Sequence, residues 1–157
     1  KEGLVAAPSP ACGQELAEAV DTGTLEGDLR AVLRDKAAFL TGPGGRLLRA
    51  LLGEAAHNET LAQALATAFT LPLHARVTDV ARRAVERGEI ASIDAIDLVG
   101  DLVTGPLVSR LLLVPRLPEE SAAAQARDTA DRLLPFLLRA LGAVPTRAPA
   151  GAAEPDV

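Results

Sequence analysis

The side chains best suited to acid–base or metal chemistry are two histidines and a short row of polar residues. His57 and His74 are the histidines of the chain. Asp97, Asp101 and Thr104 stand four and three residues apart, a spacing that puts them on one face of a helix. Carboxylates alone do not define a metal site, and no cluster of cysteine and histidine with ligand spacing accompanies them. We therefore predict no bound metal.

Sequence motifs for nucleophilic catalysis or phosphate binding are missing as well. Gly42–Gly45, with the sequence GPGG, lacks the lysine and spacing of a phosphate loop and is typical of a helix connector. No nucleophile elbow or paired-carboxylate motif is present. The sequence thus predicts a protein that is not an enzyme and needs no cofactor. Structural interpretations stay open: His57 suits a helix end, His74 a surface position or a ligand cavity, and the Asp97 row a solvated face, a pocket or a dimer seam.

Composition indicates one globular domain that does not bind nucleic acid by itself. The chain has 157 residues, 48% hydrophobic and 24% charged, and its leucine, valine and alanine favour helices. Its net charge of −5 argues against contact with phosphates. The single cysteine, Cys12, excludes an internal disulfide and fits a reducing cytoplasm. No segment resembles a signal peptide or is long enough to span a membrane.

Hydrophobic periodicity and capping residues predict an all-α fold. Thr24 and Asn58 suit N-cap positions, Gly88 suits the left-handed residue after a helix, and no strand pattern is found. A proline inside a helix removes a hydrogen bond and clashes with the carbonyl four residues earlier, so we expect distortions at such prolines. The internal prolines are Pro72, Pro106 and Pro135; the expected helices span residues 25–40, 46–57, 58–87, 94–113 and 118–141, with Asp94 as an N-cap and Pro118 as a first residue.

The last two predicted helices are apolar around most of their circumference. A helix that covers one core needs an apolar stripe only about a third of its circumference wide. These helices must therefore be buried on two sides, and in a chain of this length the second side is most simply a second copy. Gly105 and Pro106 favour close approach at such a seam, with a tolerated kink as the alternative. The predicted homodimer interface comprises Asp101, Leu102, Gly105, Pro106, Ser109, Leu112, Leu134, Leu137, Leu138 and Leu141.

Several segments resemble the C-terminal regulatory domain of TetR-family transcriptional repressors. Ala81–Ile90, ARRAVERGEI, resembles the R-A-x-x-R-G-E turn of that family, and Gly105–Leu112 resembles its G-P-L-x-x-R-L-L segment. Lys1–Val5, KEGLV, resembles the opening of the family's linking helix. Asp21–Leu29 resembles the entry into the next helix. The resemblance covers most of residues 1–141.

The resemblance implies a division of the chain. Residues 1–7 would end a linker helix from a DNA-binding domain, residues 8–142 would bind ligand and dimerise, and residues 143–157 predict a disordered tail. The family's helix-turn-helix is not in this sequence, and we expect that Lys1 is not the natural start and that the helix-turn-helix lies upstream. The last two helices of each subunit would form a four-helix bundle. A ligand in each subunit would move the linking helix and release operator DNA.

For the ligand site, the resemblance implies a cavity beside the Pro72 kink that takes a small apolar effector. Arg110 has the alternative of a structural ion pair, and the phenylalanines that of ordinary core residues. For the whole chain, the alternatives are a helical dimerisation or adaptor module and a lipid-carrying helical bundle, neither linked to DNA. The expected lining residues are Phe39, Leu48, Leu52, Leu65, Phe69, Leu73, His74, Val77, Leu107 and Arg110.

Overall fold

The structure is a computed structural model that describes residues 21–91, 96–113 and 118–143. These residues contain no β-strand, so the predicted all-α class is confirmed. No helix among them is long and apolar enough to cross a membrane. The predicted linker end (1–7), most of the predicted tail and the expected N-cap Asp94 lie outside the described residues. The elements are α2 (Leu25–Thr41), α3 (Pro43–Ala55), α4 (Glu59–Leu65), α5 (Leu71–Glu86), α6 (Ile96–Leu107) and α7 (Glu119–Ala140), with π-helical turns η1 (Ala66–Thr70) and η2 (Val108–Leu112).

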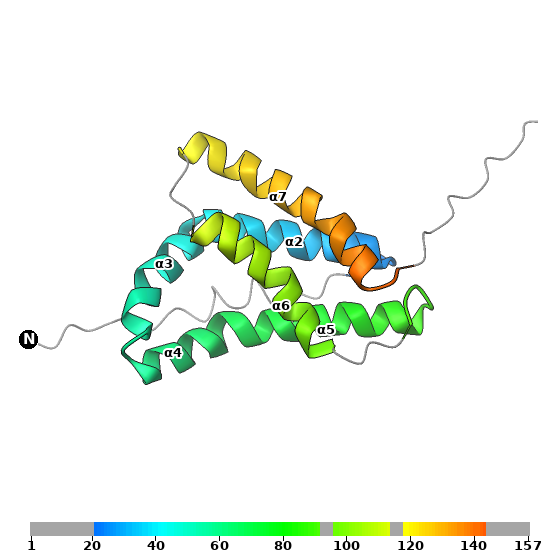
Figure 1. Ribbon diagram of the computed structural model, residues 1–157, viewed down its shortest axis with the longest axis horizontal. Helices are drawn as coiled ribbons and strands as arrows, with labels where there is room; N and C mark the ends of the chain where they lie inside the picture. The colour runs from blue at the N-terminus through cyan, green and yellow to red at the C-terminus, as the bar shows by residue number, and fades with distance from the viewer. Residues whose placement is uncertain (1–20, 92–95, 114–117, 144–157) are drawn as a thin grey trace, which may run out of the picture.

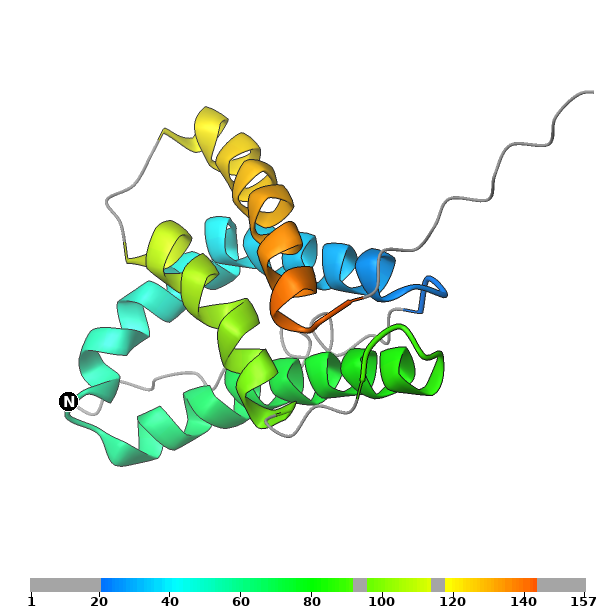
Figure 2. The same cartoon turned by 45° about the vertical axis from the view of Figure 1, so that its right-hand side comes forward.

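Helix α2 lies at the centre of the bundle (Figure 1). It packs against α7 on one side and α5 on the other, while α6 crosses both α2 and α5. Helices α4 and α5, with η1 between them, form one long rod, as both views show (Figure 2). Leu29, Val32 and Leu33 of α2 are at most 1% exposed. Because α2 contacts α3, α5, α6 and α7, its buried side chains form the centre of the shared core.

Capping residues set two helix starts and one helix end as predicted. The side chain of Thr24 accepts a hydrogen bond from the amide of Gly27 at 3.1 Å. Asn58 does the same for the amide of Leu61 at 3.0 Å. Gly88 has a φ of +73°, the left-handed conformation that ends a helix without a Cβ clash. These predictions are confirmed.

The three internal prolines have different surroundings. Shortly before Pro72, η1 separates α4 from α5 and divides the long helix predicted over 58–87, where a kink was expected, although the three segments still form one rod (Figure 1). After Pro106, α6 passes into η2. Pro135 lies inside α7, which continues through it as one α-helix. Pro118 stands one residue before α7 instead of being its first residue.

The junction between α2 and α3 is tighter than the sequence suggested. Gly42 alone links the two helices, and α3 begins at Pro43 instead of Arg46 because proline suits a first helical position. A Cβ on Gly45 would lie 1.8 Å from the carbonyl oxygen of Leu40. The GPGG segment is therefore both the connector and the first turn of α3, and Gly45 permits a close approach of the backbones of α2 and α3.

The Gly45→Ala variant should lose about 2 kcal/mol of unfolding free energy, because the methyl group meets a backbone carbonyl that cannot turn aside. Gly53→Ala is the matched control on the same helix, since nothing lies within 4 Å of its Cβ position. That control should gain roughly 0.5–1 kcal/mol from helix propensity. Urea unfolding of both variants measures the difference. Equal effects of the two changes would contradict a close approach at Gly45.

Candidate functional site

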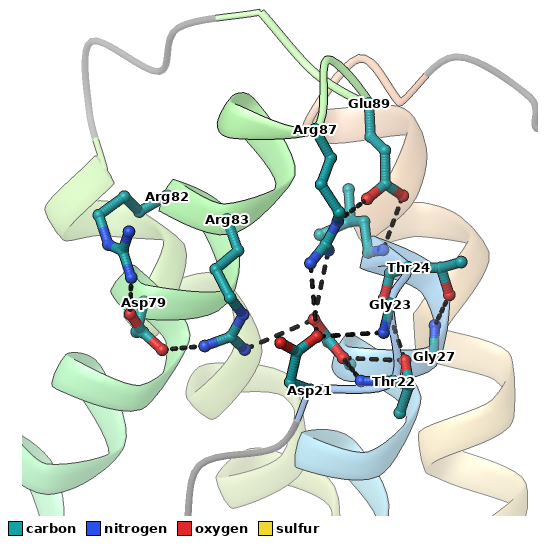
Figure 3. Close-up of polar contacts among 12 residues, drawn as sticks. Asp21, Thr22, Gly23, Thr24, Gly27, Asp79, Arg82, Arg83, Arg87 and Glu89 are labelled. Carbon is teal, nitrogen blue, oxygen red and sulfur yellow. Dashed lines mark hydrogen bonds and ion pairs between the residues drawn. The ribbon is translucent and has the colours of Figure 1, made fainter.

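Two of the segments that carry the family resemblance meet at one buried carboxylate (Figure 3). Asp28, in the first turn of α2, is 0% exposed. Its Oδ1 accepts hydrogen bonds from the backbone amide of Thr22 at 2.6 Å and from the Thr22 hydroxyl at 2.8 Å. Its Oδ2 lies 3.3 Å from Nη2 of Arg87 and 3.5 Å from Nη2 of Arg83. We call these residues, with Glu89, the Asp28 junction.

Glu89 completes the Asp28 junction from the turn after α5. Its carboxylate accepts a hydrogen bond from the amide of Leu25 at 2.7 Å and also pairs with Arg87. An acidic group at this position satisfies a free amide at the start of α2 and complements the positive end of the helix dipole. The left-handed Gly88 is the turn residue that precedes Glu89. The junction thus fastens the first turn of α2 to the last turn of α5.

Asp28 is ionised at neutral pH despite its burial. Burial alone would raise its pKa, but hydrogen bonds from Thr22 and Arg87, together with the charge of Arg83, hold the pKa below its ordinary value. From the sequence, these residues were singled out only through the family resemblance, and no partners were predicted for them. The spacing of Arg83 and Arg87, four residues apart on one helix face, could have indicated a shared acidic partner.

Seven of the predicted ligand-pocket residues belong to the buried core of the domain or pack against it. Phe69 lies in η1, and its ring centroid is 5.5 Å from that of Phe39 in α2. π-Helical turns inside longer helices occur frequently at functional sites. These seven residues come from α2, α3, α4, η1, α5 and α6. The predicted residues in the shared buried cluster, or packed against it, are Phe39, Leu48, Leu65, Phe69, Leu73, Val77 and Leu107.

Three predicted pocket residues lie apart from this cluster. Leu52 is 40% exposed on α3. Arg110 is exposed and lines a separate groove between the α6–η2 segment and α7. His74 packs on α6: its Nε2 is 3.3 Å from Oδ1 of Asp101, and a Cβ on Gly100 would lie 2.6 Å from its ring. His74 thus lies in the contact between α5 and α6, which neither of its two predicted positions, the surface and a ligand cavity, describes.

The remaining polar residues singled out in the sequence do not form a metal-binding cluster among the described residues. Asp101 is exposed beside His74, and Thr104 is half-buried with a hydroxyl that has no hydrogen-bond partner among the described residues. The side chain of Asp97 lies outside the described side chains. His57 is exposed just beyond the end of α3. Within the described ranges, no three histidine, cysteine or acidic side chains are grouped so that they could hold a metal.

The predicted interface residues divide into an outer and an inner set. Leu102 is 47% exposed on α6, and Gly105, Pro106 and Ser109 are exposed on the same stretch. Leu112, Leu134 and Leu137 are at most 4% exposed, because they pack into the core of their own subunit. We therefore assign these three to the core and not to the interface. Leu138 and Leu141 are half-buried against the same core.

An exposed phenylalanine that the sequence analysis did not select extends the outer set. Phe136 on α7 is 63% exposed, and the guanidinium carbon of Arg139 lies 4.8 Å from its ring centroid. Phe136 shares a groove of about 240 Å³ with Pro106 of α6. Leu98, one turn before Leu102, is 52% exposed. We call Leu98, Leu102, Pro106 and Phe136 the outer face.

The end of η2 is held by an arginine from α3. Nε of Arg49 donates to the carbonyl of Leu112 at 2.8 Å, and Nη2 donates to the carbonyl of Leu111 at 3.1 Å. The last carbonyls of a helix lack partners within the helix, so a positively charged donor satisfies them. This contact joins α3 to the end of the α6–η2 segment.

The Arg49→Met variant keeps the aliphatic stem but removes both hydrogen bonds to η2. We expect a loss of about 2 kcal/mol of unfolding free energy, the typical size for hydrogen bonds with a charged donor. Arg132→Met is the control, since Arg132 is exposed and, within the described part of the chain, pairs with its helix neighbour Asp128. Chemical denaturation measures both. A loss at Arg49 no larger than at Arg132 would refute this role.

Comparison with known proteins agrees with this architecture. Residues 19–151 match the family model described as Tetracyclin repressor-like, C-terminal domain. The chain is 30% identical over 129 residues to the uncharacterized HTH-type transcriptional regulators Mb1581 of Mycobacterium bovis and Rv1556 of Mycobacterium tuberculosis. Each alignment covers 82% of this chain and 62% of the relative. The uncharacterized HTH-type regulator YdeS of Bacillus subtilis is 29% identical over 93 residues, 59% of this chain and 47% of the relative.

The chain spans between 47% and 62% of the length of these curated relatives. No solved structure matches it. The match to the family model includes all the residues that the structure describes, among them the Asp28 junction, Phe69 and the outer face. The relatives are named as transcriptional regulators, which agrees with the prediction of a protein that is not an enzyme. The chain therefore belongs to the TetR family of transcriptional regulators and represents its C-terminal domain.

Proposed function

We propose that this chain is the effector-sensing and dimerisation domain of a transcriptional repressor. It acts as a homodimer, binds a small and mostly apolar molecule, and thereby releases operator DNA from a helix-turn-helix unit outside these residues. The observation that carries the proposal is the outer face, where Leu98, Leu102 and Phe136 are each about half or more exposed although the core beneath them is complete. Such an apolar patch on a folded subunit is typical of an interface.

Helix α2 offers a route between the effector site and the rest of the subunit. Phe39, near its C-terminal end, faces Phe69 in η1, and Asp28, near its start, belongs to the Asp28 junction. A ligand that separates the two rings would move α2 against α5, and the junction would carry that movement to the N-terminal end of the domain. Coupling of about 1–3 kcal/mol between the two sites is typical of such a mechanism.

A ligand screen tests the effector site. A small apolar compound that binds here should raise the melting temperature with increasing concentration. Phe69→Leu should then weaken its affinity several-fold. Leu25→Val is the control, because Leu25 is equally buried but lies about 21 Å along α2 from Phe39. Calorimetric titration of variants shown to be folded by circular dichroism separates the two cases. Equal losses at both positions would contradict a site at Phe69.

The link to DNA is tested by the gene itself. The relatives are named as HTH-type regulators and are longer than this chain, which supports a DNA-reading unit encoded before Lys1. A helix-turn-helix sequence upstream, and operator binding by the longer protein that a ligand abolishes, are the expected results. The proposal also implies a cytoplasmic location, where such an operator is. A gene without that unit would favour the helical adaptor module predicted as the alternative.

A further inference from the structure

Lys36, in the middle of α2, is a lysine inside the apolar core. It is 3% exposed. Among the described residues no carboxylate pairs with it, and the neighbouring Asp35 is bound by Arg76 at 2.8 Å. The described contact of its ammonium is with an aromatic ring: Nζ lies 5.8 Å from the centroid of Phe39. A strongly desolvated ammonium without a counter-ion among the described residues is unfavourable, so its position calls for an explanation.

The position of Lys36 coincides with the proposed effector site. Phe39, one helical turn along α2, contacts Phe69 in η1, so the ammonium and the two rings belong to one neighbourhood. Desolvation lowers the pKa of Lys36 to about 8, which leaves it mostly protonated at neutral pH. Lysine is also rare in this chain: Lys1 and Lys36 are its lysines, and the other basic residues are arginines.

We propose that Lys36 binds the anionic end of the effector, and that the effector is an apolar molecule carrying one carboxylate. The inference rests on the proposed function, because it assigns a polar anchor to the same site. The carboxylate would form a charge-assisted hydrogen bond with Nζ, and the apolar body would pack against Phe39 and Phe69. A neutral alcohol of the same shape would leave the ammonium without a counter-charge, and an amine would be repelled.

Binding of matched acids and alcohols tests the proposal. The probes are medium-chain fatty acids and the alcohols of equal chain length, titrated calorimetrically into the full chain at neutral pH. The acid should bind at least about tenfold more tightly than its alcohol. Lys36→Met, which keeps the length of the side chain, should abolish this preference. Arg30→Met is the matched control, because it removes a positive charge from an exposed position on the same helix and should leave the preference intact.

A second measurement reports on the ammonium itself. The chain has only two lysines, so the side-chain signal of Lys36 can be assigned by nuclear magnetic resonance with isotope-labelled lysine. Addition of the fatty acid should raise the pKa of Lys36 above about 8, while the alcohol should not.

Several results would overturn the proposal for Lys36. Equal binding of acid and alcohol, or a preference that survives in Lys36→Met, would leave the effector site standing without its anionic specificity. Failure of every acid, with binding of uncharged compounds from the ligand screen, would do the same. If no compound of either set binds, the proposed function fails together with this inference.

Discussion

The Phe136→Glu variant should be a folded monomer at concentrations where the wild-type chain is a dimer. Phe136 is 63% exposed in one subunit, so its loss removes little from the core, whereas a carboxylate in the proposed interface would lose its hydration. A symmetric dimer carries the change twice. We expect roughly 4 kcal/mol of lost association energy, or about a thousandfold in Kd, from two contacts of hot-spot size. Sedimentation equilibrium measures the change.

Two control variants locate the interface. Leu71→Glu changes a leucine that is 58% exposed on α5, outside the outer face, and should remain a dimer. Leu134→Glu changes a residue that is 4% exposed in the core, and should unfold the subunit instead of separating two folded ones. A wild type that is monomeric and folded, or a Phe136→Glu variant that still dimerises as tightly, would show that the outer face does not join two copies.

The Asp28→Asn variant should lose about 3 kcal/mol of unfolding free energy, the largest loss we expect from a single isosteric change in this chain. The amide keeps the shape of the carboxylate but cancels the charge that faces Arg83 and Arg87, whose side chains are 14% and 26% exposed. Two partly buried guanidinium groups then each lose one of their counter-ions, while Arg83 keeps Asp79 and Arg87 keeps Glu89. Asp128→Asn is the control, because Asp128 is exposed and pairs with Arg132 on the surface. Thermal and urea unfolding compare the two variants.

Acid should weaken the contact between Asp28 and the two arginines. The pKa of Asp28 is lower in the folded than in the unfolded chain, so its contribution is complete above the unfolded value near 4 and is lost as the pH falls through the folded value. The stability difference between wild type and Asp28→Asn should therefore shrink below about pH 4. A difference that stays constant down to the acid limit would mean that the amide disturbs packing and not charge.

The sequence was sufficient to predict the starts of α2 and α4, because both are marked by side chains that cap locally. Thr24 and Asn58 bond amides within three residues, so no distant contact is needed to foresee them. Helix orientation was harder to predict. The leucines of α7 are distributed around much of its circumference. Only the packing of α7 on α2 shows that Leu134 and Leu137 point inward while Phe136 points outward.

The burial of charged residues in the core was the other feature that the sequence did not predict. Lysine and aspartate are nearly always exposed, so the composition of α2 gave no reason to bury Lys36 or Asp28. Asp28 is buried because α5 brings Arg83 and Arg87 to it. These arginines follow Asp28 by 55 and 59 positions in the sequence. Lys36 is buried because α2 is covered from several sides. The site could be predicted as a neighbourhood of apolar residues, but its charges depend on how the helices are placed.

The π-helical turn η1 has a consequence for insertions and deletions. A π-helical turn corresponds to one residue more than an α-helix would need over the same stretch. Deleting one residue between Ala66 and Thr70 should therefore leave a regular helix and keep the face that α5 presents, because five residues of π-helix turn the chain about as far as four residues of α-helix. Arg83 and Arg87 would then still face Asp28, whereas the same deletion inside α5 would rotate every later residue by about 100°. The turn η1 thus absorbs one residue without changing the rotational phase of α5, and a relative that lacks this residue can dock its α5 by the same face.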